Sequence, residues 1–128
     1  MKEIFGWSIK NHFMIKGSEL RVWNWVNYKS EPILVTMIGV FGIQSDMDGV
    51  IVNAKFITPD LTGIPLTPEI LEKCGFKPFC KDWSKKGMII HSRKRGFVLN
   101  KKVPILTSLH QLQNLYYALT GEELEISL

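Results

Sequence analysis

Basic and aromatic side chains are concentrated in one stretch of this 128-residue chain, and together they have the chemistry of nucleic-acid binding. Residues 73–102 hold ten basic side chains and one acidic side chain, a net charge of +9, whereas residues 1–72 and 103–128 carry −2 and −3. A field of that sign attracts phosphates or an acidic protein surface. Aromatic side chains interleave with these charges, and exposed rings stack on bases. This basic block is therefore the candidate site.

Ten residues of the basic block are the candidate binding residues. They are Lys77, Lys81, Trp83, Lys85, Lys86, Arg93, Lys94, Arg95, Lys101 and Lys102. The sequences at 85–87 and 94–96 predict hairpin turns, and cationic side chains at hairpin tips can reach a phosphate backbone. An opposing interpretation places the rings of Phe76, Phe79, Trp83 and Phe97 in the core and assigns the lysines to solubility. Exposed rings would favour nucleic-acid binding, and buried rings would favour the opposing interpretation.

Motifs for enzymatic catalysis are missing from the sequence. There is no Walker loop, GxGxxG, GxSxG, HExxH or paired CxxC motif. His110 could act as a nucleolytic base beside the basic block, but a histidine on a polar helix face is more typical of a surface or capping residue. Cys74 and Cys80 are typical of free, reduced thiols, and no histidine lies at zinc-finger spacing from them. We expect a non-enzymatic protein with no metal and no cofactor.

Composition predicts a globular domain. Hydrophobic residues make up 45% of the chain and aromatic residues 11%, which is enough for a core without a disulfide or a metal. No apolar run approaches the ~18 residues of a membrane span, and residues 1–16 lack the apolar core and cleavage site of a signal peptide. We therefore expect one domain over residues 1–128, located in the cytoplasm.

The first half of the chain has the pattern of short strands. Residues 1–16 form an N-terminal extension that reads as a strand or as an appended helix or arm. Residues 20–28, 33–40 and 50–56 are rich in aromatic and β-branched side chains and predict three strands. Asp46-x-Asp48-Gly49 lacks the third ligand of a calcium loop and predicts a hairpin turn. Residues 17–66 should therefore form a small SH3-like barrel or a twisted antiparallel sheet.

The second half begins and ends with helices. Thr67 as N-cap, Pro68 in the first helical position and Gly75 as the stop predict a short helix. The basic block follows as two or three strands, at 77–83, 88–93 and 97–99. A final amphipathic helix should begin at Thr107 or Ser108 and end before Gly121. The complete pattern predicts an α+β fold.

One face of the final helix should be apolar and pack on the second sheet. The predicted apolar stripe consists of Leu109, Leu112, Leu115, Tyr116 and Leu119. His110, Gln111, Gln113, Asn114 and Tyr117 fall mostly off the stripe, and we expect the polar ones to remain at the surface for recognition.

Three segments resemble a family of small proteins from phages, prophages and other mobile elements of Bacteroidota. Residues 110–124 are similar to the family's C-terminal HQLQNLYxALTGEEL, residues 19–26 to ELRxGNxV, and residues 64–76 to IPLTxExLxxxGF. The resemblance covers residues 18–125. Trp23 stands where many relatives have glycine, and residues 1–16 extend beyond the family's usual start. The basic region varies in the family, so the resemblance assigns it no chemistry.

The resemblance implies a protein that acts against the defences of a bacterial host. Small accessory genes of mobile elements often encode inhibitors of host defence, including anti-CRISPR proteins. Bacteroidota commonly carry type VI-B systems, whose effector is an RNA-guided RNase. The expected function is therefore inhibition of a host CRISPR effector or another defence nuclease, or capture of its guide RNA. The alternatives are a nucleic-acid-binding regulator of the mobile element and a phage assembly adaptor.

Overall fold

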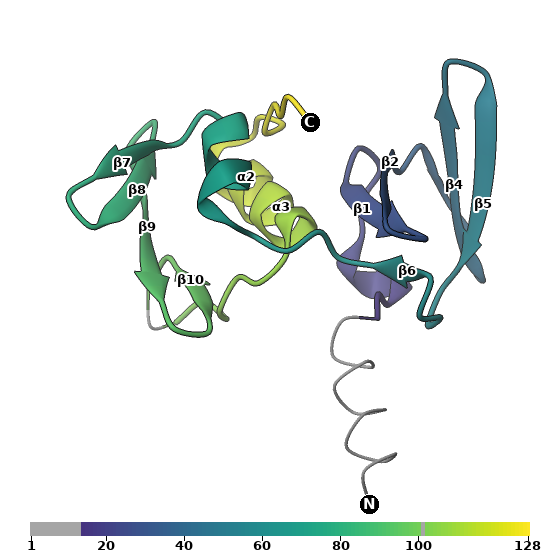
Figure 1. Cartoon of the computed structure of the whole chain (residues 1–128), viewed down its shortest axis with the longest axis horizontal. Helices are drawn as coiled ribbons and strands as arrows, with labels where there is room; N and C mark the ends of the chain where they lie inside the picture. The colour runs from purple at the N-terminus through teal and green to yellow at the C-terminus, as the bar shows by residue number, and fades with distance from the viewer. Residues whose placement is uncertain (1–13, 101) are drawn as a thin grey trace, which may run out of the picture. The chain divides into compact units, whose positions relative to one another are not determined.

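The computed structural model describes residues 14–100 and 102–128 and divides the chain into two compact units, Met1–Ile64 and Pro65–Leu128 (Figure 1). We call these the N-terminal unit and the C-terminal unit. Within these described residues, ten strands form three small antiparallel sheets and the longer of the two α-helices lies near the C-terminus, so the predicted α+β class is confirmed. The predicted extension at 1–16 falls almost entirely outside the described residues.

The N-terminal unit contains two three-stranded sheets. One has the strand order β2-β1-β6, made of Glu31–Leu34, Trp25–Tyr28 and Leu61–Thr62, and a 3-10 turn, η1 (Gly17–Glu19), precedes it. The other has the order β3-β4-β5, made of Met37–Ile38, Gly42–Met47 and Val50–Lys55. The predicted strand at 33–40 is therefore divided between the two sheets.

Strand β4 is not among the three strands predicted from the sequence, and its last residues fall in the predicted hairpin turn. Its polar side chains hide the pattern, because Gln44 and Asp46 face away from the core while Ile43 and Ser45 are buried. Gly42 lies so close to β5 that a Cβ atom there would overlap the carbonyl oxygen of Ala54. The glycine thus permits a close strand pairing and does not mark a bend.

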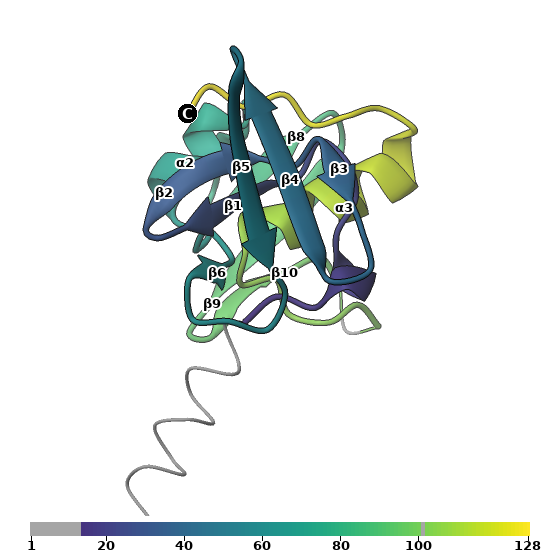
Figure 2. The same cartoon turned by 90° about the vertical axis from the view of Figure 1, so that its right-hand side faces the viewer.

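Tight turns connect the strands of this unit. Asp48 and Gly49 have φ angles of 54° and 82°, which makes them the two central residues of the β4–β5 hairpin. The predicted hairpin turn is confirmed, and Figure 2 shows the two strands running side by side into it. Trp23 also has a positive φ, 79°. Glycine adopts that conformation without strain, whereas a residue with a Cβ atom, such as Trp23, adopts it less readily.

Both sheets contribute to one core in the N-terminal unit. Its buried side chains are Ile15, Leu20, Val26, Ile33, Val35, Ile43, Ala54 and Leu61. Because β1, β2 and β6 supply some of these residues and β4 and β5 the others, the two sheets must face each other across the core.

The C-terminal unit opens with the short helix α2 (Pro68–Lys73). Thr67 is its N-cap and accepts a hydrogen bond from the backbone N–H of Ile70 at 3.2 Å, and Gly75 follows the helix with a φ of 86°. The predicted cap, first-position proline and glycine stop are all confirmed.

A four-stranded antiparallel meander follows, in the order β10-β9-β8-β7. The strands are Lys77–Phe79, Asp82–Lys85, Met88–Arg93 and Gly96–Val98, numbered in chain order as β7 to β10. The single strand predicted at 77–83 is wrong, because Cys80 has a positive φ of 57° and begins a two-residue turn. Helices α2 and α3 lie beside one face of this sheet (Figures 1 and 2).

Helix α3 spans Leu109–Thr120, with Ser108 as N-cap and Gly121 in the left-handed conformation at its end. Gln111 Oε1 accepts hydrogen bonds from the backbone N–H groups of Thr107 and Ser108 at 2.8 and 3.1 Å. The predicted boundaries are confirmed. Neither of the described α-helices is long and apolar enough to cross a membrane.

The predicted apolar stripe on α3 is correct only for the first part of the helix. Leu109, Leu112 and Tyr116 are buried, but Leu119 is 56% exposed. All residues from 117 to 120 are exposed, so the last turn of α3 extends beyond its packing partners. His110 and Gln113, which were expected at the surface, are buried. The buried face of the helix is therefore wider than the leucine spacing indicates.

Candidate nucleic-acid interface

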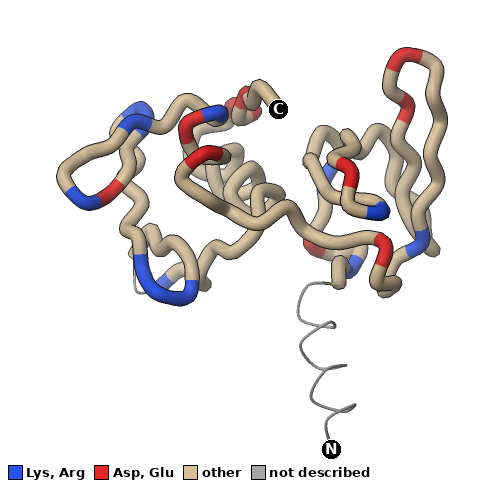
Figure 3. The backbone as a smooth tube through the Cα atoms, in the orientation of Figure 1, with Lys and Arg blue, Asp and Glu red and all other residues tan. Residues whose placement is uncertain are grey.

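The C-terminal unit carries all of the chain's net charge. Residues 1–64 hold six basic and six acidic side chains, whereas residues 65–128 hold ten basic and six acidic, a difference of +4. Figure 3 shows basic residues at the turns of the meander and acidic residues at the tip of the β4–β5 hairpin. An electrostatic attraction for phosphate therefore belongs to the C-terminal unit.

The meander separates the basic turns into two groups. Successive antiparallel turns alternate between the ends of a sheet, so the β7–β8 and β9–β10 turns lie at one end and the β8–β9 turn at the other. We call the first group the basic end; it consists of Lys81, Arg93, Lys94 and Arg95. The candidate residues of the sequence thus do not form one continuous patch.

Lys85 and Lys86, at the opposite end of the sheet, both interact with other groups of the C-terminal unit. Lys85 Nζ donates a hydrogen bond to the carbonyl oxygen of Cys74 at 2.6 Å and lies 5.4 Å from the centroid of the Tyr116 ring. This carbonyl follows helix α2, where the helix dipole favours a cation. Lys85 is half-buried, so the prediction that it projects into solvent is wrong.

Lys86 forms an ion pair with Glu122, with 2.9 Å between Nζ and Oε2. The hydrogen bond raises the pKa of Lys86 and lowers the pKa of Glu122. Both side chains are 62% exposed, so the pair adds little to stability. Its effect on binding is larger, because a phosphate near Lys86 would also lie near the Glu122 carboxylate.

The cations of the basic end are more available. Lys81, Lys94 and Arg95 are exposed and make no ion pair within the described residues, and Arg93 donates a hydrogen bond to the carbonyl oxygen of Ser92 at 2.8 Å. Other predicted site residues lie elsewhere. Lys77 is exposed at the start of β7, Lys102 is exposed in the loop after β10, and Lys101 lies outside the described residues.

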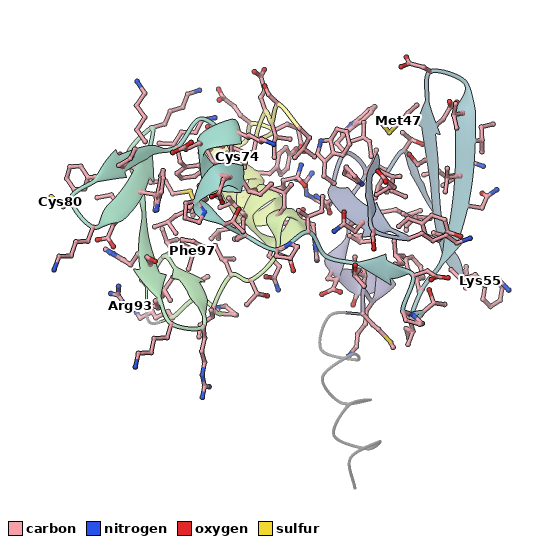
Figure 4. The ribbon with its side chains drawn as sticks, in the orientation of Figure 1. Met47, Lys55, Cys74, Cys80, Arg93 and Phe97 are labelled. Atoms are coloured by element: carbon pink, nitrogen blue, oxygen red, sulfur yellow. The ribbon has the colours of Figure 1, made fainter. Side chains whose placement is uncertain are left out.

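Two of the aromatic side chains belong to the core. Phe76 and Phe97 are 2% and 6% exposed, so neither can stack on a base. Figure 4 shows Phe97 on the helix side of the sheet and Arg93 pointing away from it. For Phe76 and Phe97, burial favours the opposing interpretation, which placed these rings in the core.

Trp83 and Phe79 lie on opposite faces of the sheet. Trp83 pairs with Ile90, which is fully buried, so both face the helices, and Trp83 is half-buried. Phe79 pairs with Asp82, the next residue of β8, and is 51% exposed on the other face. We call this second face the open face. Alternation could have identified Phe79, but only with the turn at Cys80 known.

A side-chain hydrogen bond crosses the open face between β8 and β9. Asp82 Oδ2 lies 2.9 Å from His91 Nδ1, and the backbone N–H of Ser92 donates a hydrogen bond to Asp82 Oδ1 at 3.3 Å. The hydrogen bond with His91 is the main cause that lowers the pKa of Asp82. Asp82 is therefore a charged carboxylate near neutral pH, and it fixes the position of the His91 ring.

The cysteines and histidines of the described residues are the sequence's candidates for reactivity and metal binding. Burial raises the pKa of Cys74 to about 12, which keeps its thiol protonated, while Cys80 is an exposed free thiol. In residues 14–100 and 102–128, no three His, Cys, Asp or Glu side chains gather where they could hold a metal ion. His110 is buried and not the surface residue that the sequence indicated.

A second surface, on the N-terminal unit, was missed in the sequence. Val40 and Phe41 are 88% and 83% exposed, and Met37 and Ile57 nearby are each 58% exposed. We call these four residues the apolar patch. Val40 and Phe41 line two neighbouring grooves, in the loop between β3 and β4. Exposed apolar groups of this density are typical of protein contacts.

Two surfaces with different chemistry are therefore present. The basic end and the open face can contact phosphates and bases, and the apolar patch can contact a protein. Comparison with other proteins adds no assignment, because no family model, curated protein or solved structure matches the chain.

Proposed function

We propose that this chain is a non-enzymatic binding protein that inhibits a host defence nuclease of the RNA-guided type, by contacting the nuclease or its guide RNA. The observation that carries the proposal is the contrast between the two ends of the basic sheet. Cations at the opposite end are bonded within the protein, whereas Lys81, Lys94 and Arg95 are exposed and without an ion pair in the described part of the chain.

The basic end could bind RNA because its cationic side chains lie on turns, from which they can contact backbone phosphates. Lys94 and Arg95 occupy a two-residue turn, so both side chains extend from the end of a rigid hairpin. Arginine can bind a phosphate with two parallel hydrogen bonds, and lysine acts as a point charge. Such contacts fix position without reading sequence, as capture of a guide RNA of any sequence requires.

The apolar patch could bind a protein target. Val40 and Phe41 would lose a large apolar area to a partner, and aromatic side chains are enriched at interface cores. Asp46 and Asp48 at the exposed end of the β4–β5 hairpin add a negative charge to the same unit. That charge complements the basic surface of an RNA-binding protein. A ribonucleoprotein target would use both surfaces.

The resemblance to mobile-element proteins supports this context and makes a type VI-B effector the first target to test. It also supports action in the cytoplasm of the bacterial host. The chain would then act at stoichiometric concentration, since inhibition by binding consumes one inhibitor for each effector complex.

The test is an RNA-cleavage assay with a purified type VI-B effector, its guide RNA and a labelled target RNA. The wild-type chain should reduce the cleavage rate in proportion to its molar ratio to the effector. K94Q/R95Q should inhibit less, and K85Q/K86Q should inhibit as the wild type does. Full cleavage in the presence of excess wild-type chain would refute inhibition of this effector.

A nucleic-acid-binding regulator of the mobile element is the second candidate, because the same basic end would serve it. A pull-down from host lysate separates the two. A nuclease partner that survives RNase treatment supports the inhibitor, bulk nucleic acid that is lost on treatment supports the regulator, and phage structural proteins support an assembly adaptor.

A further inference from the structure

Four side chains form one row across the open face of the C-terminal unit. Phe79 of β7 pairs with Asp82 of β8, and His91 of β9 pairs with Val98 of β10. The Asp82–His91 hydrogen bond joins the two halves. The neighbouring positions Ile90 and Phe97 are buried on the helix side, so strand alternation places this row on the side away from the helices.

The row presents two rings to solvent. Half of Phe79 is exposed, at 51%, and the His91 side chain is 36% exposed. Phe79 is held in the β7–β8 pairing, so its exposed half has a fixed position on the open face. Unpaired bases stack on phenylalanine and histidine rings, and every base offers a face for this contact.

Cations lie on both sides of these rings. Lys77 precedes Phe79 by two residues on the same strand, and Arg93 follows His91 by two residues, so each cation is about 7 Å along the strand from its ring. The basic end continues from Arg93. The one acidic side chain in the row, Asp82, already bonds His91 and the backbone N–H of Ser92.

We infer that the open face binds single-stranded RNA, with an unpaired base stacked on Phe79 and the adjoining phosphates at Lys77, Arg93 and the turns of the basic end. This inference rests on the proposed function and adds the strandedness of its ligand. A duplex can place phosphates at the basic end, but its bases are stacked on each other and cannot reach Phe79. Single strands therefore bind more tightly than duplexes of the same length.

The test measures fluorescence anisotropy with a labelled 12-nucleotide oligouridine and with a 12-base-pair RNA duplex. The wild-type chain should prefer the single strand. F79L keeps an apolar side chain but removes the ring, and it should weaken single-strand binding by roughly 5- to 150-fold, the range that corresponds to the loss of one stacked base. The affinity of F79L for the duplex should equal that of the wild type. F79Y, which keeps an aromatic ring, should bind the single strand as the wild type does.

The alternative results separate this inference from the proposed function. Equal affinity for both RNAs, with F79L like the wild type but K94Q/R95Q weakened, would refute single-strand stacking and keep RNA binding at the basic end. Binding of neither RNA would refute both. Melting temperatures of F79L and F79Y equal to that of the wild type exclude unfolding as the cause, as expected for an exposed side chain.

Discussion

Replacing Lys94 and Arg95 with glutamine removes two charges from the β9–β10 turn without disturbing an internal contact. Neither side chain has an ion pair within the described residues, and neither residue has a positive backbone φ angle. We expect the K94Q/R95Q variant to fold with an unchanged melting temperature. Any loss of RNA binding then reports the removed phosphate contacts.

The magnitude follows from counterion release. Each phosphate contact with a single strand contributes about 0.7 to the slope of log K against log salt, so two lost contacts should reduce the slope by about 1.4. If the variant and the wild type bind equally at ~1 M salt, this difference in slope amounts to a loss of roughly 25-fold in affinity at ~0.1 M salt. Anisotropy titrations of oligouridine at several salt concentrations measure both quantities.

The matched control is K85Q/K86Q, which removes the same number of adjacent charges from the β8–β9 turn. Lys85 is bonded to the Cys74 carbonyl and Lys86 to Glu122, so this variant should lower the melting temperature and leave the salt slope unchanged. Equal loss of slope in both variants would mean that the internal contacts do not withdraw these lysines from RNA. The distinction between the two ends of the sheet would then be wrong.

Three further predictions concern stability. L112A should cost about 2–4 kcal/mol in urea unfolding because Leu112 is fully buried, whereas L119A, at an exposed position, should change little; equal costs would contradict the observed helix face. G42A should destabilise the chain by about 1–3 kcal/mol, since its Cβ would overlap the Ala54 carbonyl, and a wild-type melting temperature would argue against the β4–β5 pairing. The pKa of Asp82 is lowered, so its stabilising effect is present above the unfolded pKa of about 3.9 and is lost as pH falls through the folded value. D82N should therefore lose less stability than the wild type as pH falls below that unfolded value, and parallel curves would contradict the Asp82–His91 hydrogen bond.

Local signals in the sequence predicted the helices and most turns. Thr67, Gly75 and Gly121 each act on their own backbone or within one helical turn, so no tertiary contact is needed to predict their effect. The Asp48-Gly49 hairpin is local in the same sense. These features also decide the α+β class, because they fix where helices end and strands reverse.

The composition of the site depended on contacts that are distant in sequence. Lys85 is withdrawn from solvent by a carbonyl eleven residues earlier and by an aromatic ring on another helix. The single positive φ at Cys80 shifts the alternation, so that Phe79 and Trp83 lie on opposite faces. A sequence pattern shows neither effect, and for this reason the four aromatic side chains of the basic block could not be divided in advance into the exposed Phe79 and the buried Phe76 and Phe97.

The exposed loop at Val40 and Phe41 shows a further limit of prediction from the sequence. Apolar residues beside glycines were read as the end of a strand, since apolar side chains are usually buried in a sheet. Only the paired strands β3 and β4 show that these two residues lie in the connection between them.

Chemical-shift mapping tests the central claim most directly. Backbone amide spectra of the isotope-labelled chain, recorded during titration with oligouridine, report which residues meet RNA. If RNA binds at the open face and the basic end, we expect shifts at the β7–β8 turn, at Phe79 and at the β9–β10 turn, and none at the β4–β5 hairpin. Shifts confined to the N-terminal unit, or an unchanged spectrum at saturating RNA, would contradict it.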